Sequence, residues 1–517
     1  MKKVLPRKIS CLSAMIMFCL SGGAAFADTT IQPVNGNINL AANSVPVVNI
    51  NQPGQDGVSH NQYSQFDVGS QGVVLNNAQS TVQSQLAGAV NANPNLDAGA
   101  AKVILNEINS SDRTLLNGMI EVAGQKADVI VANRSGITCN GCGFINTGTG
   151  VLTTGELQFK DKQFTGYNVT GGTVAFEGKG LQKGDVDYTA VIARAENINA
   201  AVRAKTLLVL AGKKNVKADL TGYTNLESKD RAPEVLVDVS QLGGMYAGKI
   251  TLIADEKGVG VNSSNNNNGN NNVGNNTGNN NGNNNINIGG NNGSAKSPIS
   301  LKNQGELVTD GGDLMLSTTS IVNKGTLLSG ANSFIQTTSL ENTGEIKAND
   351  SAHFRTTLLK NDNVISAENN VTISTTSVEN SRNGQIMARN GGIALKNTLF
   401  SNSGKVQARH EITNSGTSFS NSGTLISSQG DITSSGTTFS NTGSLVASKG
   451  AITSSGTSFY NTGNIQADKN INWKGTSFYN QGKITSTQGS VFNNGRDINK
   501  PVVVSPPQQY PWWYPRW

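Results

Sequence analysis

The feature that most constrains the fold of this chain is a repeat in its C-terminal half. An Asn recurs there every 19 or 20 residues, with one longer step of 22, and a hydrophobic residue stands two positions before it. The recurring Asn residues are Asn303, Asn323, Asn342, Asn361, Asn380, Asn402, Asn421, Asn441, Asn461 and Asn480. The hydrophobic residues are Leu301, Ile321, Leu340, Leu359, Val378, Phe400, Phe419, Phe439, Phe459 and Phe478. This regularity predicts a stack of short units, each in contact only with its neighbours.

Each unit is predicted to form one coil of a right-handed parallel β-helix. The period is too short for helical repeats, and the Leu-rich consensus of a horseshoe repeat is missing. Three short strands and three turns fit the period, with the hydrophobic residues stacked inside and the Asn residues forming side-chain ladders. A Gly usually follows each Asn by two positions, which we attribute to a turn with positive φ that both residues tolerate. Residues 381–384, in the longer step, read as a turn insertion.

The N-terminal half also consists of short apolar runs bounded by Asn and Gly, but it lacks the regular period. Only 14% of the residues are charged and 59 are Gly, a balance that suits turns between short strands better than amphipathic helices. Residues 190–210 are also compatible with a helix, but runs of Val, Ile and Leu bounded by Asn and Gly favour strands. The expected fold class is therefore all-β: a parallel β-helix followed by a second β-helical array of about ten coils.

The first 27 residues have the pattern of a signal peptide. Lys2, Lys3, Arg7 and Lys8 precede a mostly apolar run over residues 9–20, and a small-x-small cleavage site follows. The apolar run is too short to cross a bilayer. The protein is therefore expected to be exported, and the mature chain to be soluble or attached to the cell surface.

A tract of Asn and Gly over residues 262–297 divides the exported chain. It contains almost no apolar residues, so it cannot offset its ordering entropy and is expected to be a disordered linker. The expected parts are a signal peptide (1–27), an N-terminal β-helix (28–260), the linker (261–297), the repeat array (298–495) and a tail rich in Pro and aromatic residues (496–517). We expect residues 28 to about 255 to fold without the array.

Cleavage of the signal peptide leaves two cysteines, Cys139 and Cys142. In an oxidising compartment a pair at this spacing favours a structural disulfide. A zinc site would need two further ligands that no nearby His or Cys supplies, and a redox site would need a βαβ context. Both remain as weaker alternatives.

The composition argues against nucleic-acid binding and against catalysis. Removal of the four signal-peptide cations lowers the formal net charge from +6 to +2, too little for a concentrated basic face. His60, His353 and His410 lie far apart, and the acidic residues of the array are scattered singly, whereas a β-helical polysaccharide lyase or hydrolase needs clustered carboxylates. Asp185 and Asp187 lack the spacing of a calcium loop. No catalytic residue, metal ligand or cofactor is therefore assigned.

Several N-terminal motifs resemble the secretion domain of filamentous-haemagglutinin-type exoproteins of bacterial two-partner secretion. One segment matches the first family motif, and residues 132–144 resemble the second, which ends in the Cys pair. The residues that carry both motifs are Asn93, Pro94, Asn95, Leu96, Asn133, Gly136 and Ile137. Segments 57–63, 72–77 and 192–194 fit as well, so the resemblance covers about residues 30–255. Arg134 and Ser135 depart from the Pro and Asn of the family, which makes that turn less preorganised.

The resemblance implies an export route as well as a fold. Proteins of this family are carried unfolded through the periplasm of Gram-negative bacteria and pass through an outer-membrane β-barrel transporter. The transporter recognises the N-terminal domain, which then folds outside and nucleates the rest of the β-helix. The motif residues are therefore expected to serve transporter recognition or secretion.

The favoured function is that of a secreted or surface-displayed adhesin that contacts host or neighbour-cell glycans or proteins. The alternative is a truncated or remnant member of the contact-dependent toxin-delivery exoproteins or cytolysins, because little chain follows the last coil. The aromatic tail is a candidate contact surface, beside a simpler interpretation as an extended cap. Its residues are Trp512, Trp513, Tyr514 and Trp517.

Overall fold

The computed structural model describes residues 29–36, 38–227, 230–256 and 298–498, and this part of the chain contains strands and no helix. The predicted signal peptide, the Asn/Gly tract and the aromatic tail with Trp512, Trp513, Tyr514 and Trp517 lie outside the described residues. Within the described ranges, nothing helical is long and apolar enough to span a membrane.

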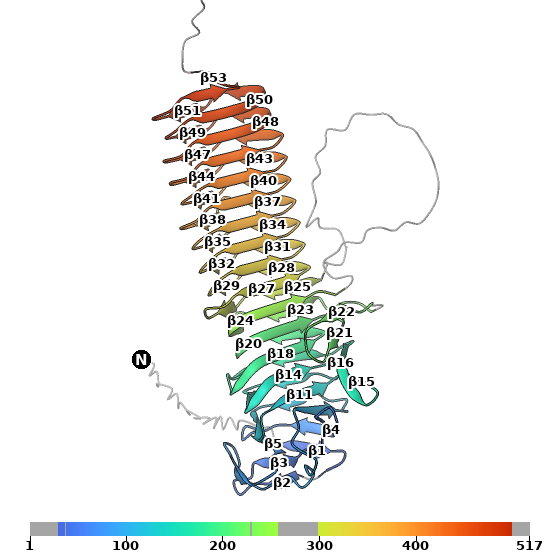
Figure 1. Ribbon diagram of the computed structural model, residues 1–517. Helices are drawn as coiled ribbons and strands as arrows, with labels where there is room; N and C mark the ends of the chain where they lie inside the picture. The colour runs from blue at the N-terminus through green and yellow to red at the C-terminus, as the bar shows by residue number, and fades with distance from the viewer. Residues whose placement is uncertain (1–28, 37, 228–229, 257–297, 499–517) are drawn as a thin grey trace, which may run out of the picture.

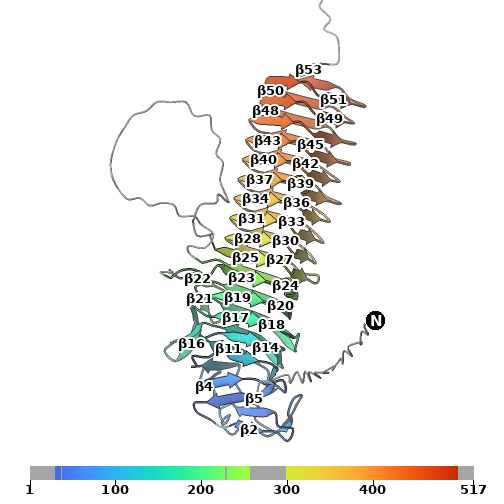
Figure 2. The ribbon, with the colours of Figure 1, turned by 180° about the vertical axis from the view of Figure 1, so that it is seen from behind.

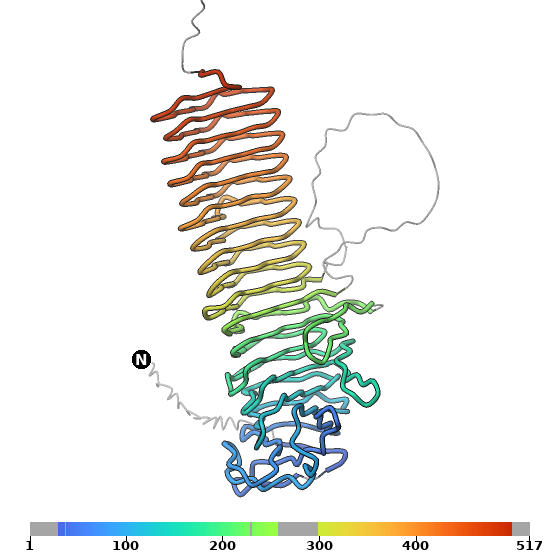
Figure 3. The backbone as a smooth tube through the Cα atoms, viewed as in Figure 1, coloured from blue at the N-terminus to red at the C-terminus, as the bar shows by residue number. Residues whose placement is uncertain are grey.

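The chain winds into a parallel β-helix, an elongated stack of coils (Figures 1 and 3). Within the stack, a typical strand pairs in parallel with its equivalents one coil earlier and one coil later. For example, β28 (Ser320–Asn323) lies between β25 (Ile299–Asn303) and β31 (Ser339–Asn342). The all-β, β-helical expectation is confirmed, and residues 190–210, for which a helix was the alternative, fall mainly in strands.

Each coil of the array contributes one strand to each of three faces. The view from behind shows the same stack of successive coils from its other side (Figure 2). The first face, whose strands end at the recurring Asn, continues with β34 (Leu358–Asn361), β37 (Ser377–Asn380), β40 (Leu399–Asn402), β43 (Ser418–Asn421), β46 (Thr438–Asn441) and the later halves of β48 (Ile452–Asn461) and β50 (Ile471–Asn480). The second face comprises β26 (Glu306–Thr309), β29 (Thr326–Ser329), β32 (Glu345–Ala348), β35 (Val364–Ala367), β38 (Gln385–Ala388), β41 (Lys405–Ala408), β44 (Thr424–Ser427), β47 (Ser444–Ala447), β49 (Asn464–Ala467) and β51 (Lys483–Ser486). The third comprises β27 (Leu314–Thr318), β30 (Ser333–Gln336), β33 (Ala352–Arg355), β36 (Val371–Ser374), β39 (Ile393–Lys396), β42 (Ile412–Ser415), β45 (Ile432–Ser435), the earlier halves of β48 and β50, and β52 (Val491–Asn493).

The N-terminal coils are built on the same plan with longer and less equal strands. One face contains β4 (Val58–Asp67), β8 (Val103–Ile108), β11 (Ala127–Asn133), β14 (Thr147–Thr153), β18 (Val186–Ala193), β20 (Ala201–Ala211) and β24 (Gly244–Ala254). A second contains β9 (Thr114–Leu116), β12 (Ile137–Cys139), β17 (Thr173–Phe176), β19 (Ala195–Ile198) and β23 (Val235–Val239). A separate parallel sheet contains β3 (Pro46–Asn49), β5 (Val73–Asn77), β10 (Met119–Gly124) and β13 (Gly143–Ile145).

Antiparallel strands close the ends of the β-helix and cover one of its sides. At the N-terminal end, β1 (Thr30–Pro33) pairs with β4, β2 (Ile38–Leu40) pairs with β3, and β6 (Val82–Ser84) pairs with β7 (Gly88–Val90). At the C-terminal end, β53 (Arg496–Asp497) pairs with β52. A four-stranded sheet of β15 (Glu156–Lys160), β16 (Gln163–Val169), β21 (Lys214–Lys217) and β22 (Tyr223–Asn225) lies outside the coils and packs on the outer side of the face that holds β11, β14 and β18.

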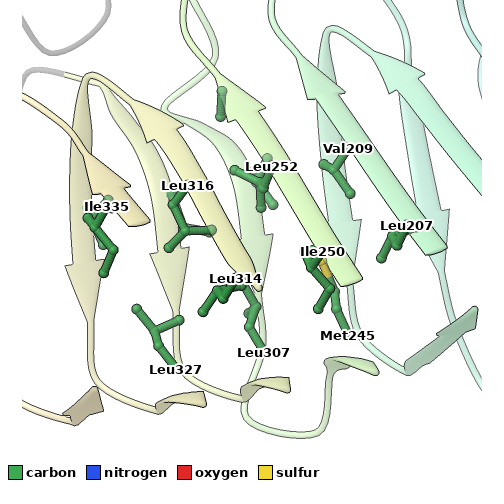
Figure 4. Close-up of a cluster of buried hydrophobic side chains, with 14 of the residues drawn as sticks. Leu207, Val209, Met245, Ile250, Leu252, Leu307, Leu314, Leu316, Leu327 and Ile335 are labelled. Carbon is green, nitrogen blue, oxygen red and sulfur yellow. The ribbon is translucent and has the colours of Figure 1, made fainter. Parts of the chain in front are cut away.

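The coils before and after residues 257–297 stack directly on each other. Strand β23 pairs in parallel with β25, and β24 pairs with both β26 and β27. Ile250 and Leu252 on one side of this junction and Leu314 and Leu316 on the other belong to a single buried cluster (Figure 4). The described parts of the chain therefore form one continuous β-helix, because the strand register passes without a break from the N-terminal coils into the array.

The inward stacking expected for the array is confirmed. The rings of Phe419 and Phe439 lie 4.9 Å apart and those of Phe439 and Phe459 5.0 Å apart, in both cases nearly parallel. Phe439 is only 4% exposed. The recurring Asn residues form the expected ladder: each Nδ2 donates to the Oδ1 of the Asn one coil later, at 2.7–2.8 Å. Each coil thus satisfies the buried amides of the next.

The reason that we gave for the repeated Gly of the array is wrong. Gly325, Gly423 and Gly443 are not among the residues with positive φ. A Cβ on Gly423 would instead lie 2.1 Å from the carbonyl oxygen of Gly404, one coil earlier, and a Cβ on Gly443 would lie 2.1 Å from that of Gly423. Glycine is therefore required there by the close approach of successive turns. The predicted insertion in the longer step is confirmed as a turn at residues 382–383.

Candidate recognition turns of the N-terminal coils

The first motif forms a turn held by one buried amide. The side chain of Asn93 is buried, and its Nδ2 donates to the backbone oxygens of Ile50 at 2.9 Å and Asn76 at 2.8 Å. Its Oδ1 accepts the backbone N–H of Asn95 at 3.0 Å, and its backbone oxygen accepts that of Leu96. Leu96 points into the core, whereas Pro94 is exposed. The turn is therefore fixed from inside and presents Pro94 and part of Asn95 to solvent.

The second motif repeats this construction at another corner. Asn133 is buried, and its Nδ2 donates to the backbone oxygen of Asp112 and to Oγ1 of Thr114, both at 2.9 Å. Its Oδ1 accepts the backbone N–H of Ser135 at 2.9 Å, and its backbone oxygen accepts that of Gly136 at 3.0 Å. Both motifs are thus Asn turns in which the side chain ties the corner to an earlier stretch of chain.

Gly136 and Ile137 of the second motif have structural roles at this corner. Gly136 has a φ of +114°, and a Cβ there would lie 2.6 Å from Nη1 of Arg113. Ile137 is fully buried in the core. Gly is therefore required at the turn, because other residues rarely adopt this conformation and no space is left for a side chain.

The two departures from the family pattern have separate structural roles. The hydroxyl of Ser135 donates to the backbone oxygen of Ser110 at 2.7 Å, a bond that joins this turn to the preceding coil. Arg134 is exposed, with its guanidinium 4.0 Å from the Glu156 carboxylate. The Ser135 hydrogen bond could not be found from the sequence of the turn, because its acceptor lies in the preceding coil.

A shallow groove of about 510 Å³ opens beside the second turn. It is lined by Ile108, Asn109, Ser110, Arg134, Ser135, Thr154, Thr170 and Gly171. The groove follows the corners of three successive coils, and most of its lining residues are small and polar. Arg134 is its only charged lining residue.

Cys139 and Cys142 are joined in a disulfide, with their Cα atoms 5.3 Å apart. Both residues are buried. The bond spans the turn that leads from β12 to β13 and holds the end of the second motif. Because neither sulfur is accessible, the site has the character of a structural crosslink.

A buried ion pair near the end of the N-terminal coils was missed by the sequence analysis. Arg194 lies in segment 192–194, quoted above only for its resemblance, and its Nη2 and Nε donate to the Glu256 carboxylate at 2.9 and 3.2 Å. The Glu256 side chain is 0% exposed. Next to it, Lys214 is fully buried, and its Nζ donates to Asp255 Oδ1 at 2.5 Å. Burial lowers the pKa of Lys214, and the carboxylates of Asp255 and Glu256 oppose that shift.

The other polar residues considered in the sequence contribute to the fold. His60 Nε2 lies 2.8 Å from Glu107 Oε2, and this hydrogen bond lowers the pKa of Glu107. Asp187 pairs with Lys126 at 2.8 Å and Lys205 at 2.9 Å, and these bonds lower the pKa of its carboxyl to about 2. Over the described ranges, no three His, Cys, Asp or Glu side chains are placed to hold a metal ion.

Comparison with known proteins places this N-terminal region in a defined group. The family model described as TPS secretion domain matches residues 24–288. The chain is 46% identical to Toxin CdiA of Yersinia pestis over 262 residues, which are 50% of this chain and 8% of that protein. It is 40% identical to tRNA nuclease CdiA of Escherichia coli (strain STEC_O31) over 327 residues, which are 59% of this chain and 10% of that protein. The chain thus spans about a tenth or less of the length of these relatives.

Solved structures are similar as well. The crystal structure of the filamentous hemagglutinin secretion domain aligns with a TM-score of 0.42 and 22% identity, over 73% of this chain and 95% of that chain.

Proposed function

This chain belongs to the TPS secretion domain family, whose model matches about half of it, and we propose that an outer-membrane β-barrel transporter recognises the N-terminal coils and exports the chain. The protein is a two-partner secretion exoprotein, secreted or displayed at the cell surface of a Gram-negative bacterium. The observation that carries the proposal is the pair of Asn turns. Each is fixed from inside by a buried amide and leaves only a few backbone and side-chain groups for a partner.

The division of each turn into buried and exposed atoms separates recognition from stability. Asn93 and Leu96 are buried, so their replacement would disturb the corner itself. Pro94 is exposed and Asn95 is half-buried, with one bond from its Nδ2 to the backbone oxygen of Ile50. The folded turn therefore depends least on the side chains of Pro94 and Asn95, so their part in transporter recognition can be tested without disturbing the corner.

The experiment compares Asn95→Ala with Asp97→Ala, a matched change at an exposed neighbour without a hydrogen bond to the fold. Asn95→Ala should sharply reduce the amount of protein in the medium, while the purified protein keeps a melting temperature within a few degrees of the parent. Asp97→Ala should be secreted normally. If Asn95→Ala unfolds the protein, or is secreted like Asp97→Ala, the turn is structural and the recognition role is wrong.

For the repeat array we propose contact with a surface outside the cell, as in an adhesin. One column of the array supports this: a Thr stands four positions before each recurring Asn from the second coil onward. The column consists of Thr319, Thr338, Thr357, Thr376, Thr398, Thr417, Thr437, Thr457 and Thr476. Successive members are linked by backbone hydrogen bonds, as between Thr437 N–H and the Thr417 oxygen at 2.8 Å, and all but Thr319 are exposed.

Threonine in this column has no packing role that would require it. The side chains point to solvent, so their hydroxyl and methyl groups form a regular polar stripe. Successive Thr residues in this stripe are about 4.8 Å apart, the spacing of neighbouring strands. Such a stripe suits a glycan or protein surface that offers hydrogen-bonding groups along its length. Replacement of Thr417, Thr437 and Thr457 by Val keeps the shape and removes the hydroxyls, and should reduce adherence of purified protein to cells or glycan surfaces.

The control for this experiment replaces Thr413, Thr433 and Thr453 by Val. These residues form a second exposed column on the same coils. The control should adhere like the parent. Equal adherence of both variants would remove the Thr column as a contact surface.

A second candidate function is contact-dependent toxin delivery, favoured by the names of the relatives. The names of those proteins contain the word toxin or nuclease, and the similarity covers at most a tenth of their length. In this role the described coils would be the secreted stalk that presents an effector. Co-culture with a neighbour strain distinguishes the two: loss of the neighbour in mixed growth favours delivery, whereas binding without inhibition favours adhesion.

A further inference from the structure

Glu196 lies in a column of hydrophobic residues inside the β-helix. It lies in β19, where the parallel register places it between Val174 of β17 and Val237 of β23. The same inward column continues through both parts of the chain. Its members include Ile137, Val174, Glu196, Val237, Leu301, Ile321, Leu340, Leu359, Val378, Phe400, Phe419, Phe439 and Phe459.

No group in the surrounding coils compensates this carboxyl. Glu196 is 0% exposed, and neither of its oxygens has a hydrogen-bond partner. The side chains that β17, β20 and β23 turn inward are hydrophobic, among them Phe176, Val202 and Val239. The ionisable residues of the packed strands face outward: Asp187 and Tyr188 on β18, Arg203 and Lys205 on β20, and Asp238 on β23.

An unpartnered carboxyl in this position opposes the closure of its own coil. The group must lose its water when the coil forms, and it gains no hydrogen bond in return. Burial raises the pKa of Glu196 well above its ordinary value of 4.5, because loss of water favours the neutral acid over the carboxylate in the folded coil. Above that ordinary value the folded state binds a proton that the unfolded chain has lost, and the stability of the coil therefore falls as the pH rises.

We propose that Glu196 delays the folding of the N-terminal coils, so that the chain stays unfolded until enough neighbouring coils have formed to bury the carboxyl. The proposal rests on the proposed export function, because slow folding of a coil helps a chain that must cross a membrane unfolded. Val174 and Val237 show that the column accepts an aliphatic residue directly above and below this position. The carboxyl is thus dispensable for packing, and its presence acts against closure.

The test is refolding of the purified mature chain by dilution from urea, at several pH values between about 5 and 8. Glu196→Val continues the column, Glu196→Gln keeps a polar side chain that does not titrate, and Glu234→Gln is the control at an exposed Glu one coil away. The parent and the control should refold more slowly as the pH rises. Their folding equilibrium constant should fall by up to about tenfold per pH unit. Glu196→Val and Glu196→Gln should lose this pH dependence, and Glu196→Val should refold fastest at every pH.

Each outcome decides the proposal independently of the transporter, since refolding in solution does not involve it. If Glu196→Val gains stability but refolds at the rate of the parent, the carboxyl weakens the coil without delaying it, and the proposal is wrong. If it gains neither stability nor rate, the inward placement is wrong as well. In cells, a faster-folding Glu196→Val chain should be secreted less. Unchanged secretion of that variant would overturn the link to export while leaving the recognition turns untouched.

Discussion

The N-terminal coils and the array share the β-helical fold but stabilise their coils in different ways. In the array a single arrangement recurs in coil after coil: a stacked hydrophobic residue, an Asn whose amide bonds to the next Asn, and usually a Gly where successive turns touch. In the N-terminal coils the corners are held individually, by Asn93, by Asn133, by the disulfide, and by the pair of Arg194 and Glu256. Regular coils therefore share their stabilising contacts, whereas irregular coils each need one of their own.

This difference has a consequence for function. A partner cannot bind at one defined position of the array through a corner that recurs identically, because every coil presents the same surface. A corner built once, such as the Pro94 turn or the groove beside Arg134, is a unique surface. The proposed recognition therefore suits the irregular region, and the proposed extended contact suits the regular region.

The largest expected effect comes from separating the two regions. A fragment of residues 28–256 should remain folded, but with a clearly lower melting temperature than the same region in the whole chain. It loses the pairing of β23 and β24 with the array and uncovers inward residues such as Ile250 and Leu252, at roughly 1.5–3 kcal/mol for each large side chain fully exposed. Limited proteolysis and thermal melting test this. Rapid digestion of the fragment to peptides would show that the N-terminal coils depend on the array.

Within the array, Phe439→Ala should destabilise by about 3–5 kcal/mol, because it leaves a cavity between two stacked rings. Ser440→Ala on the same strand should cost less than ~0.5 kcal/mol, since this side chain points outward. Urea unfolding measures both. Equal losses at the two positions would contradict the inward register.

In the N-terminal coils, Arg194→Met should destabilise by about 3–5 kcal/mol, because it leaves the Glu256 carboxylate buried without its partner. Arg203→Met is the matched control: this Arg is exposed and lies over the Tyr246 ring at 5.6 Å, a contact that contributes about 0.5–1 kcal/mol. A small effect of Arg194→Met would show that the corner tolerates the loss and that the coils share their contacts after all.

Replacement of both Cys139 and Cys142 by Ser should lower the melting temperature only modestly. The bridge closes a loop much shorter than the 15 residues for which about 3 kcal/mol is expected, so it constrains little of the unfolded chain. Thermal melting with and without a reductant tests this, since the parent under reducing conditions should match the variant. A collapse of the fold would assign the disulfide a larger role in holding the second turn.

The smallest expected effect is a pH dependence at the His60 and Glu107 pair. The hydrogen bond from His60 lowers the pKa of Glu107 below its ordinary value of 4.5, so its stabilising contribution is present above that value and is lost as the pH falls through the lowered pKa. The side chains are 32% and 20% exposed, so less than about 1 kcal/mol is at stake. Stability of Glu107→Gln against the parent between about pH 3 and 6 measures it. An effect that grows toward neutral pH would point to Glu196, whose dependence has the opposite sign.

Much of the array could be predicted because its determinants are local and repeated. The spacing of the Asn residues predicts the coil length, and the position of Phe439 two residues before Asn441 predicts the ring stack. The Gly residues could be found in the same way but not explained, since the atom that excludes a side chain at Gly423 belongs to the preceding coil. In the N-terminal coils the two motif turns could be located from sequence. Their buried bonds, which reach from Asn93 back to Ile50, could not be.

What the sequence by itself determined is the β-helix, its coil length in the array and the identity of the inward residues, because periodicity reports which side chains share a face. Only the tertiary structure decided which residues meet across coils of unequal length. Arg194 and Glu256 are separated by 62 positions and meet at 2.9 Å, and Glu196 falls into a column of hydrophobic residues that no local pattern announces. Where the period is regular, a register can be counted along the chain. Where loops and the outer sheet interrupt it, register depends on the packing of the whole N-terminal region.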